Sequence, residues 1–205
     1  MALLTEQERE RIERAVIEAE ANTSGEIVPM VVAASDDYPG ARWRVATAFG
    51  FLCALVALLV VPDLNPWWIM VGFGPALLVG HLLAARPGIL RQALWPHKID
   101  EEVAQRAFEA FMQNNLHATR DRTGVLVFVS MLEHRIQIIS DIGIDQKAPE
   151  GFWQQVVDEL VDRVKKGELA DGLVHAIHAC GELLSEQFPR RADDENELPD
   201  KVIVE

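Results

Sequence analysis

The pattern of apolar and polar residues divides the chain into helices and short strands. Residues 5–21 carry an apolar stripe at helical spacing, and Thr5 with Glu8 three residues later has the sequence of a capping box, which predicts a helix. Residues 26–34 are rich in Val and Ile and predict a first strand. Pro29 within it lacks the N–H that a sheet ladder needs, so an edge or locally irregular position is expected.

The second half of the chain mixes the same two patterns. It predicts, in chain order, a helix over 100–119, strands over 124–130 and 134–140, and helices over 149–166 and 169–187. The first strand reaches the second through a crossover that contains a helix, so these two should be parallel, whereas the tight turn that follows makes the third antiparallel. The expected fold class is therefore α/β, with a small mixed β-sheet covered by helices.

Two long apolar runs interrupt this domain. Residues 45–61 and 67–85 contain no Asp, Glu, Lys or Arg, and a short turn with two prolines, Pro62 and Pro66, joins them. As helices they would each reach roughly 26–28 Å, close to the hydrocarbon thickness of a bilayer. One such run is compatible with a buried core helix, whereas two in tandem favour a transmembrane hairpin inserted in the crossover.

The charges beside the two runs predict their orientation, because Lys and Arg near a span tend to stay in the cytoplasm. The connecting turn carries only Asp63, whereas the outer flanks carry Arg42, Arg44, Arg86, Arg91 and Lys98. We therefore expect two spans in the inner (cytoplasmic) membrane, with both termini in the cytoplasm. No signal peptide is expected at the N-terminus, and the two cysteines, Cys53 and Cys180, suit a reducing compartment.

These features divide the chain into three parts. Residues 1–41 and 98–188 are expected to form one discontinuous cytoplasmic domain, 42–97 the membrane hairpin, and 189–205 an acidic flexible tail. An alternative for the tail is that Val202–Val204 adds to a sheet edge. The net charge of −13 argues against nucleic acid as a partner, because its phosphates would be repelled.

Four segments in order resemble the TPM domain family, specifically its bacterial branch with a transmembrane hairpin inside the domain. They are "SGEIVPMVV", "TGVLVFVS", "HRIQIISDIGID" and "GELADGL", and the resemblance extends over about residues 5–188. It implies an α/β/α sandwich. Relatives include thylakoid-lumen proteins of photosystem II repair, for which acid phosphatase activity has been proposed, and others that bind calcium or modulate membrane complexes. The chain departs from the family pattern at Pro29 and at "RDRTG", where many relatives have Asp-Asn-Gly before the second strand.

The predicted strand directions bring several carboxylates to one edge of the sheet. The first strand begins there, the second also begins there, and the third ends there, which places together Glu26, Asp121, Asp141 and Asp145. Oxygen ligands of this kind suit Ca²⁺ or Mg²⁺. The alternative is that acids at strand ends are expected in a chain with 32 of them, and that Asp121 pairs with Arg120 or Arg122.

A second group of possible ligands lies on the last predicted helix, where one stripe carries Asp171, His175, His178 and Glu182. Two His at this spacing with a carboxylate are able to bind zinc, although such a stripe is more often a solvated flank. No Gly-x-Ser-x-Gly elbow and no glycine-rich phosphate loop occurs in the sequence.

Two classes of function remain at this point. The favoured one is a non-catalytic, membrane-anchored cytoplasmic domain that contacts the lipid bilayer and binds another membrane protein, or a second copy of itself, in a membrane complex. The alternative is a divalent-metal-dependent, phosphatase-like hydrolase that uses the carboxylates at the sheet edge. Neither catalytic residues nor a substrate can be assigned from the sequence.

Overall fold

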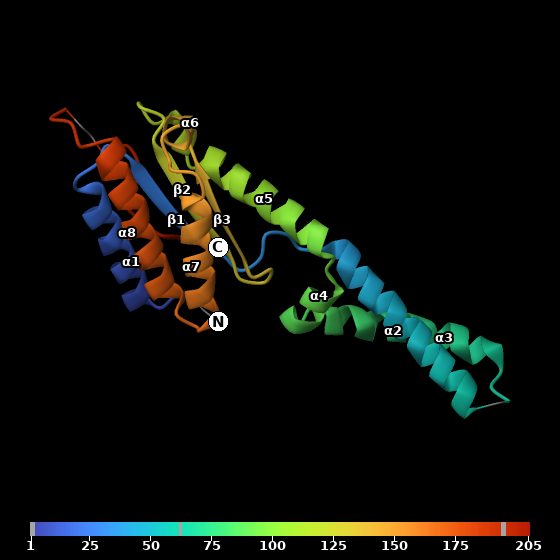
Figure 1. Cartoon of the computed structure of the whole chain (residues 1–205). Helices are drawn as coiled ribbons and strands as arrows, with labels where there is room; N and C mark the ends of the chain where they lie inside the picture. Colours follow the sequence, from blue (N-terminus) through green and yellow to red (C-terminus); the bar gives the residue numbers. More distant parts are fainter. Residues whose placement is uncertain (1–2, 62, 194–195) are drawn as a thin grey trace. The chain divides into compact units, whose positions relative to one another are not determined.

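A computed structural model of the chain describes residues 3–61, 63–193 and 196–205 (Figure 1). It has two compact units, one made of Met1–Ser35 and Asp100–Glu205, and the other of Asp36–Ile99. In the sequence, the second unit is inserted between the first two strands of the sheet that belongs to the first unit.

The first unit is built on a four-stranded mixed sheet with the order β3-β2-β1-β4. Its strands are β1 (Glu26–Val32), β2 (Gly124–Ser130), β3 (Arg135–Ser140) and β4 (Ile203–Val204). β1 and β2 are parallel, and β2 and β3 are antiparallel. The strand directions predicted from the crossover and the tight turn are therefore confirmed. All residues of β1 and β2 are buried, so both faces of the sheet are covered.

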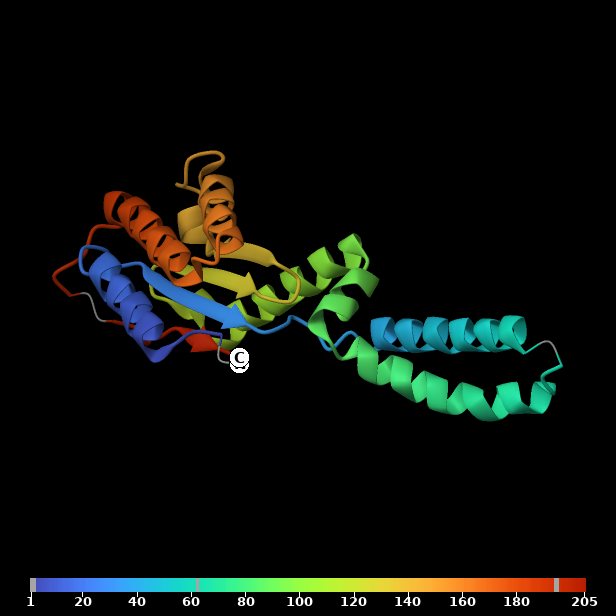
Figure 2. The same cartoon turned by 90° about the horizontal axis from the view of Figure 1, so that it is seen from below.

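Helices lie on both faces of this sheet. One face carries α1 (Glu6–Glu20), α7 (Phe152–Lys165) and α8 (Leu169–Gln187), and the other carries α5 (Pro96–Gln113), which belongs to this unit from Asp100 onward (Figure 1, Figure 2). A turn of 3-10 helix, η1 (Leu116–Ala118), follows α5. On the face covered by α1, α7 and α8, alternate residues of the strands pack against apolar residues of the helices. This core includes Ile12, Val16, Ile27, Val31, Val127, Leu173, Ile177 and Leu184. The predicted helices are therefore present, with ends that differ by a few residues.

Local sequence explains where α1 begins. Thr5 N donates to Glu8 Oε2 at 2.7 Å and Glu8 N donates to Thr5 Oγ1 at 3.3 Å, which is the reciprocal pair of a capping box. These bonds with Thr5 lower the pKa of Glu8, so its carboxylate is ionised at neutral pH. The predicted capping box is confirmed.

The outer edge of β1 explains how a proline fits in this strand. Glu26 N donates to Thr123 O at 3.1 Å, so its N–H points toward β2. Backbone N–H groups alternate in direction along a strand, so the backbone nitrogens of Ile27, Pro29, Val31 and Ala33 lie on the side away from β2. Ile27 N donates to the Glu20 side chain at 2.7 Å, Ala33 N donates to Glu205 O at 2.7 Å, and β4 pairs beside Val31. Pro29 has no N–H to satisfy, so it is tolerated on the side of β1 that faces β4, although β1 is an inner strand and not the edge strand expected from the sequence.

The C-terminal segment differs from the flexible tail expected from its composition. Ile203–Val204 form β4 in parallel with β1, Val202 is buried, and Glu205 N donates to Val31 O at 3.1 Å. The arrangement found is thus the alternative one, addition to a sheet edge. Burial of Val202 anchors this segment to the core, and arginines pair with its acids and offset its negative charge. Asp194 and Glu195 lie outside the described residues.

The second unit consists of α2 (Pro39–Val60), α3 (Pro66–Ala84) and α4 (Pro87–Ala93). By length and composition α2 and α3 are able to cross a membrane, with mean hydropathies of 2.0 and 1.6 and only 11% of each apolar window buried. A Cβ at Gly80 would lie 2.8 Å from Ala46 Cα, so glycine is needed for this close approach of the two helices. Pro62 of the predicted turn lies outside the described residues.

Two helix starts in the second unit go beyond the sequence prediction. α2 begins six residues before the predicted run, at Pro39, and α4 was not predicted. Both begin with proline, whose fixed φ and missing N–H suit the first helical position. Charged residues in these stretches hid the helices from a search for apolar runs.

Candidate functional site

The end of the sheet where β1 and β2 begin and β3 ends gathers the carboxylates predicted as a site, and we call it the basal edge. Thr123 precedes β2, and its Oγ1 donates to Ser24 O at 2.9 Å. Asp141 follows β3, and its N donates to Gly124 O at 2.9 Å. These bonds hold the three strand ends together, as the strand directions require.

Asp141 is buried and bound by an arginine. Arg122 Nε lies 2.7 Å from Asp141 Oδ2, and Arg122 Nη2 donates to Oδ1 at 2.9 Å, which is a two-point contact between guanidinium and carboxylate. Asp141 Oδ1 also accepts from Ile142 N at 2.7 Å and so caps the short helix α6 (Ile142–Asp145). This carboxylate is therefore neutralised and is also part of the local fold.

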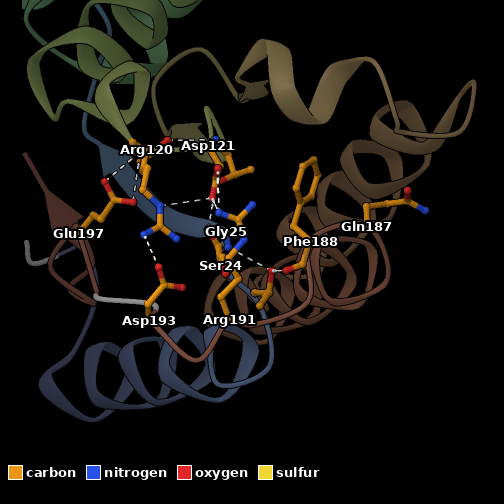
Figure 3. A network of polar contacts seen from close by, with 12 residues as sticks. Ser24, Gly25, Arg120, Asp121, Gln187, Phe188, Arg191, Asp193 and Glu197 are labelled. Carbon is orange, nitrogen blue, oxygen red and sulfur yellow. Dashed lines mark hydrogen bonds and ion pairs between the residues drawn. The ribbon is translucent and has the colours of Figure 1, made fainter.

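Asp121 is bound by an arginine from the C-terminal segment. Arg191 Nη1 lies 2.9 and 3.2 Å from the two carboxylate oxygens of Asp121, and Arg120 Nε lies 3.7 Å away (Figure 3). Arg120 in turn faces Asp193, at 3.3 Å, and its backbone N donates to the Glu197 carboxylate at 3.0 Å. Charges of both signs thus alternate across the basal edge and attach the C-terminal segment to it.

Glu26 and Glu20 are enclosed by the same segment. Glu26 Oε1 accepts from Glu197 N at 3.0 Å, and Asp200 lies beside both glutamates in a pocket of about 200 Å³. Burial raises the pKa of Glu20 to about 9, despite the bond from Ile27 N, and the charges of Glu26 and Asp200 add to this increase. Burial also raises the pKa of Glu26. This pocket therefore holds three acidic side chains beside Arg190, and burial favours the protonated form of Glu20.

The four predicted metal ligands do not form one ligand set. Asp141 and Asp121 are bound by arginines, Glu26 accepts from a backbone amide, and Asp145 lies in α6. Within the ranges that the structure describes, no group of three or more His, Cys, Asp or Glu residues is placed to hold a metal ion. The sequence brought the right strand ends together, and the alternative that Asp121 pairs with Arg120 is confirmed at 3.7 Å. It did not indicate that Arg191 also binds Asp121 or that Arg122 binds Asp141.

The stripe on α8 is also divided among separate partners. Asp171 pairs with Arg11, and His175 Nε2 lies 2.7 Å from Glu159 Oε2 of α7. His178 and Glu182 line a hollow next to α1, and Glu182 also lines a groove that it shares with His175 and Glu159. The alternative expected for this stripe, a solvated flank, is closer to what the structure contains than a zinc site.

Two nucleophilic side chains, those of Ser130 and Cys180, lie in the interior. Ser130 Oγ donates to Glu133 Oε2, but both residues are 1% exposed, so a substrate does not reach this pair. Glu133 also accepts from Ser35 N at 2.9 Å and thereby ties the end of β1 to the turn after β2. Burial raises the pKa of the Cys180 thiol to about 12, which keeps it protonated and unreactive.

Sequence reasoning missed the residues that close the basal edge. Arg191, Asp193 and Glu197 were assigned to a flexible tail, and Glu20 was treated only as part of a helix. The one local signal was the Arg190-Arg191 pair directly before a run of acids, which indicates a segment with charges of both signs.

Comparison with known proteins supports part of the resemblance. The family model described as TPM domain matches residues 94–183, a range that includes β2, β3, α7 and most of α8 but not β1. The NMR structure of BA42 protein from the psychrophilic bacterium Bizionia argentinensis has the same fold, with a TM-score of 0.62 and 22% sequence identity over 99% of this chain and 96% of that chain. Among curated proteins no significant match is found.

Proposed function

We propose that this chain is a membrane-anchored protein whose TPM-like α/β domain lies in the cytoplasm and serves as a non-catalytic binding or assembly module for a membrane protein complex. The observation that carries the proposal is the pair of apolar helices α2 and α3, inserted between the strands of an otherwise separate unit. Side chains at the tip of this pair are very exposed, with Leu59 and Val60 at 72% and Trp67 at 65%.

Exposed apolar surface of this extent is unfavourable in water and favourable in lipid. The flanking arginines and Lys98 favour a cytoplasmic position for both ends of the hairpin, because the connecting turn carries no basic residue. Trp67 and Trp68, directly after the turn, suit the membrane interface on the side opposite the cytoplasm. The bilayer is thus the first partner that we propose.

The arrangement of the basal edge gives no specific support to hydrolysis. Asp121 and Asp141 are held by Arg191 and Arg122, so a metal ion would have to displace guanidinium groups before it reached either carboxylate. The Ser130–Glu133 pair is buried. The metal-dependent hydrolase therefore lacks a specific observation in its favour, and we do not propose it.

Topology fusions test this function. A reporter that is active only outside the cytoplasm should give signal when it is inserted at Asn65 and none when it is fused after Glu205. The C-terminal fusion needs a flexible linker, because Glu205 bonds to Val31 and Ala33. Signal from the C-terminal fusion, or from neither site with normal protein levels, would contradict the proposed anchor.

A further inference from the structure

Helices α7 and α8 form a hairpin with a groove along its outer surface. The groove has a volume of about 380 Å³. Its floor contains apolar side chains, including Phe152, Val156 and Leu183, and its rim contains Glu159, Glu182 and Glu186. No Lys or Arg lines it in the part of the chain that the structure describes.

One end of the groove is closed by contacts between the two helices. A Cβ at Gly172 would lie 2.7 Å from Leu160 Cδ1, so the helices meet closely there. His175 Nε2 and Glu159 Oε2, 2.7 Å apart, bridge the helices one turn further along. From Glu159 to Phe152 α7 rises about 10 Å, so the groove offers about two turns of helix to a partner.

The rim of the groove carries three carboxyl side chains. Hydrogen bonds from Gln155 and from His175 lower the pKa of Glu159, and Glu182 and Glu186 are exposed carboxylates. An apolar floor between acidic rims matches a helix that has one apolar face and Lys or Arg beside it. An acidic or uncharged helix would offer no basic side chain to Glu182 and Glu186, whereas Glu159 already contacts His175.

We infer that this groove binds a basic amphipathic helix that lies next to a transmembrane span of an integral membrane protein. The inference rests on the proposed function, which places the domain on the cytoplasmic side of the membrane. Segments beside spans on that side carry an excess of Lys and Arg, and the proposed anchor keeps the domain on the same side of the same bilayer. The groove then supplies the contact by which the anchored domain recognises its partner.

Photo-crosslinking of the full chain tests the groove. A benzoylphenylalanine placed at Gln155 faces the groove, and one placed at Gln154 is the matched control, because this neighbouring residue does not line it. The chain is held in nanodiscs of zwitterionic phosphatidylcholine, so that lipid charge does not attract the probe. The probe is a helical peptide of about 18 residues, five turns, with a Leu face and a Lys face. A peptide with Glu in place of Lys is the control for charge.

The Lys peptide should crosslink at Gln155 at least about tenfold more than at Gln154, and the Glu peptide should not crosslink. Glu182→Lys with Glu186→Lys should lower the yield at Gln155 by about tenfold or more, whereas Glu6→Lys with Glu10→Lys, the same charge change on the exposed face of α1, should not. Equal yields at Gln155 and Gln154, no effect of the groove variant, or equal capture of the Glu peptide would overturn the groove as a basic-helix site.

A second arm identifies the partner class. Membranes from cells that produce the chain with benzoylphenylalanine at Gln155 are irradiated, and the crosslinked peptide is sequenced by mass spectrometry. A Lys- and Arg-rich segment beside a predicted span supports the inference, whereas a soluble protein or a second copy of this chain overturns it. The peptide arm does not depend on topology, so failure of the groove is distinguishable from failure of the membrane anchor.

Discussion

Substitution of Glu20 by Gln should stabilise the protein at neutral pH. Glu20 accepts from Ile27 N at 2.7 Å, and burial raises its pKa from 4.5 to about 9. The folded state therefore keeps a proton that the unfolded state releases above pH 4.5. By linkage, stability is fully present below pH 4.5 and falls as the pH rises toward 9. Gln has no charge to bury, and its amide oxygen is still able to accept from Ile27 N.

The magnitude follows from the interval between the two pKa values. One pKa unit corresponds to about 1.36 kcal/mol, so between pH 4.5 and pH 7 the parent loses up to about 3 kcal/mol through this group. Partial solvent contact of the side chain reduces this upper bound. We expect Glu20→Gln to raise the free energy of unfolding by about 1–3 kcal/mol at pH 7, and by much less at pH 5.

The assay is urea unfolding of the full chain in a nonionic detergent at several pH values between pH 5 and pH 9, with circular dichroism as the readout. Glu10→Gln on the exposed face of α1 is the control and should leave the pH dependence as in the parent. The reasoning is refuted if Glu20→Gln is no more stable than the parent at pH 7, or if both lose stability with the same slope between pH 5 and pH 9.

Three further predictions concern the stability of the domain and its response to divalent metal ions. Replacement of residues 42–97 by a flexible linker should leave a soluble chain that unfolds cooperatively, because its core lies outside them, and aggregation without a cooperative transition would count against this. Glu133→Ala should lower the free energy of unfolding by about 1–3 kcal/mol, because Ser35 N and Ser130 Oγ lose their acceptor. Glu133→Gln should lower it by less, and equal losses of stability in a urea titration would argue against Glu133 as this acceptor. Millimolar Ca²⁺, Mg²⁺ or Mn²⁺ should leave the thermal midpoint of the full chain unchanged because Arg122 and other arginines already neutralise the basal edge, and a rise of several degrees would refute this.

Elements with strong local signals were predictable from the sequence. The capping box at Thr5 located the start of α1, and periodic apolar residues located α7 and α8. The β2–β3 hairpin followed from two short apolar runs around a turn. In each case residues close in sequence decide the structure, so a single chain contains the needed information.

Contacts between distant residues were predictable only in part. The parallel pairing of β1 and β2 followed from the crossover, whereas the two-residue strand β4 was only an alternative, because its pairing with Met30–Val31 joins segments far apart in the chain. The basal edge shows the same limit. Arg122 is next to Asp121 in sequence but binds Asp141, while Asp121 is bound by Arg191. Which arginine reaches which carboxylate depends on backbone geometry, here a left-handed φ of 59° at Arg122, that composition does not encode.

The order of strands has a consequence for synthesis. β1 leaves the ribosome first, its neighbour β2 only after the whole of the second unit, and its other neighbour β4 only after β3, α7 and α8. Until Ile203–Val204 have emerged, β1 therefore lacks at least one of its two neighbours and the sheet is incomplete. Nascent chains stalled before Ile203 should be more sensitive to protease than the released protein. Deletion of residues 203–205, which removes β4, would extend this state to the finished protein.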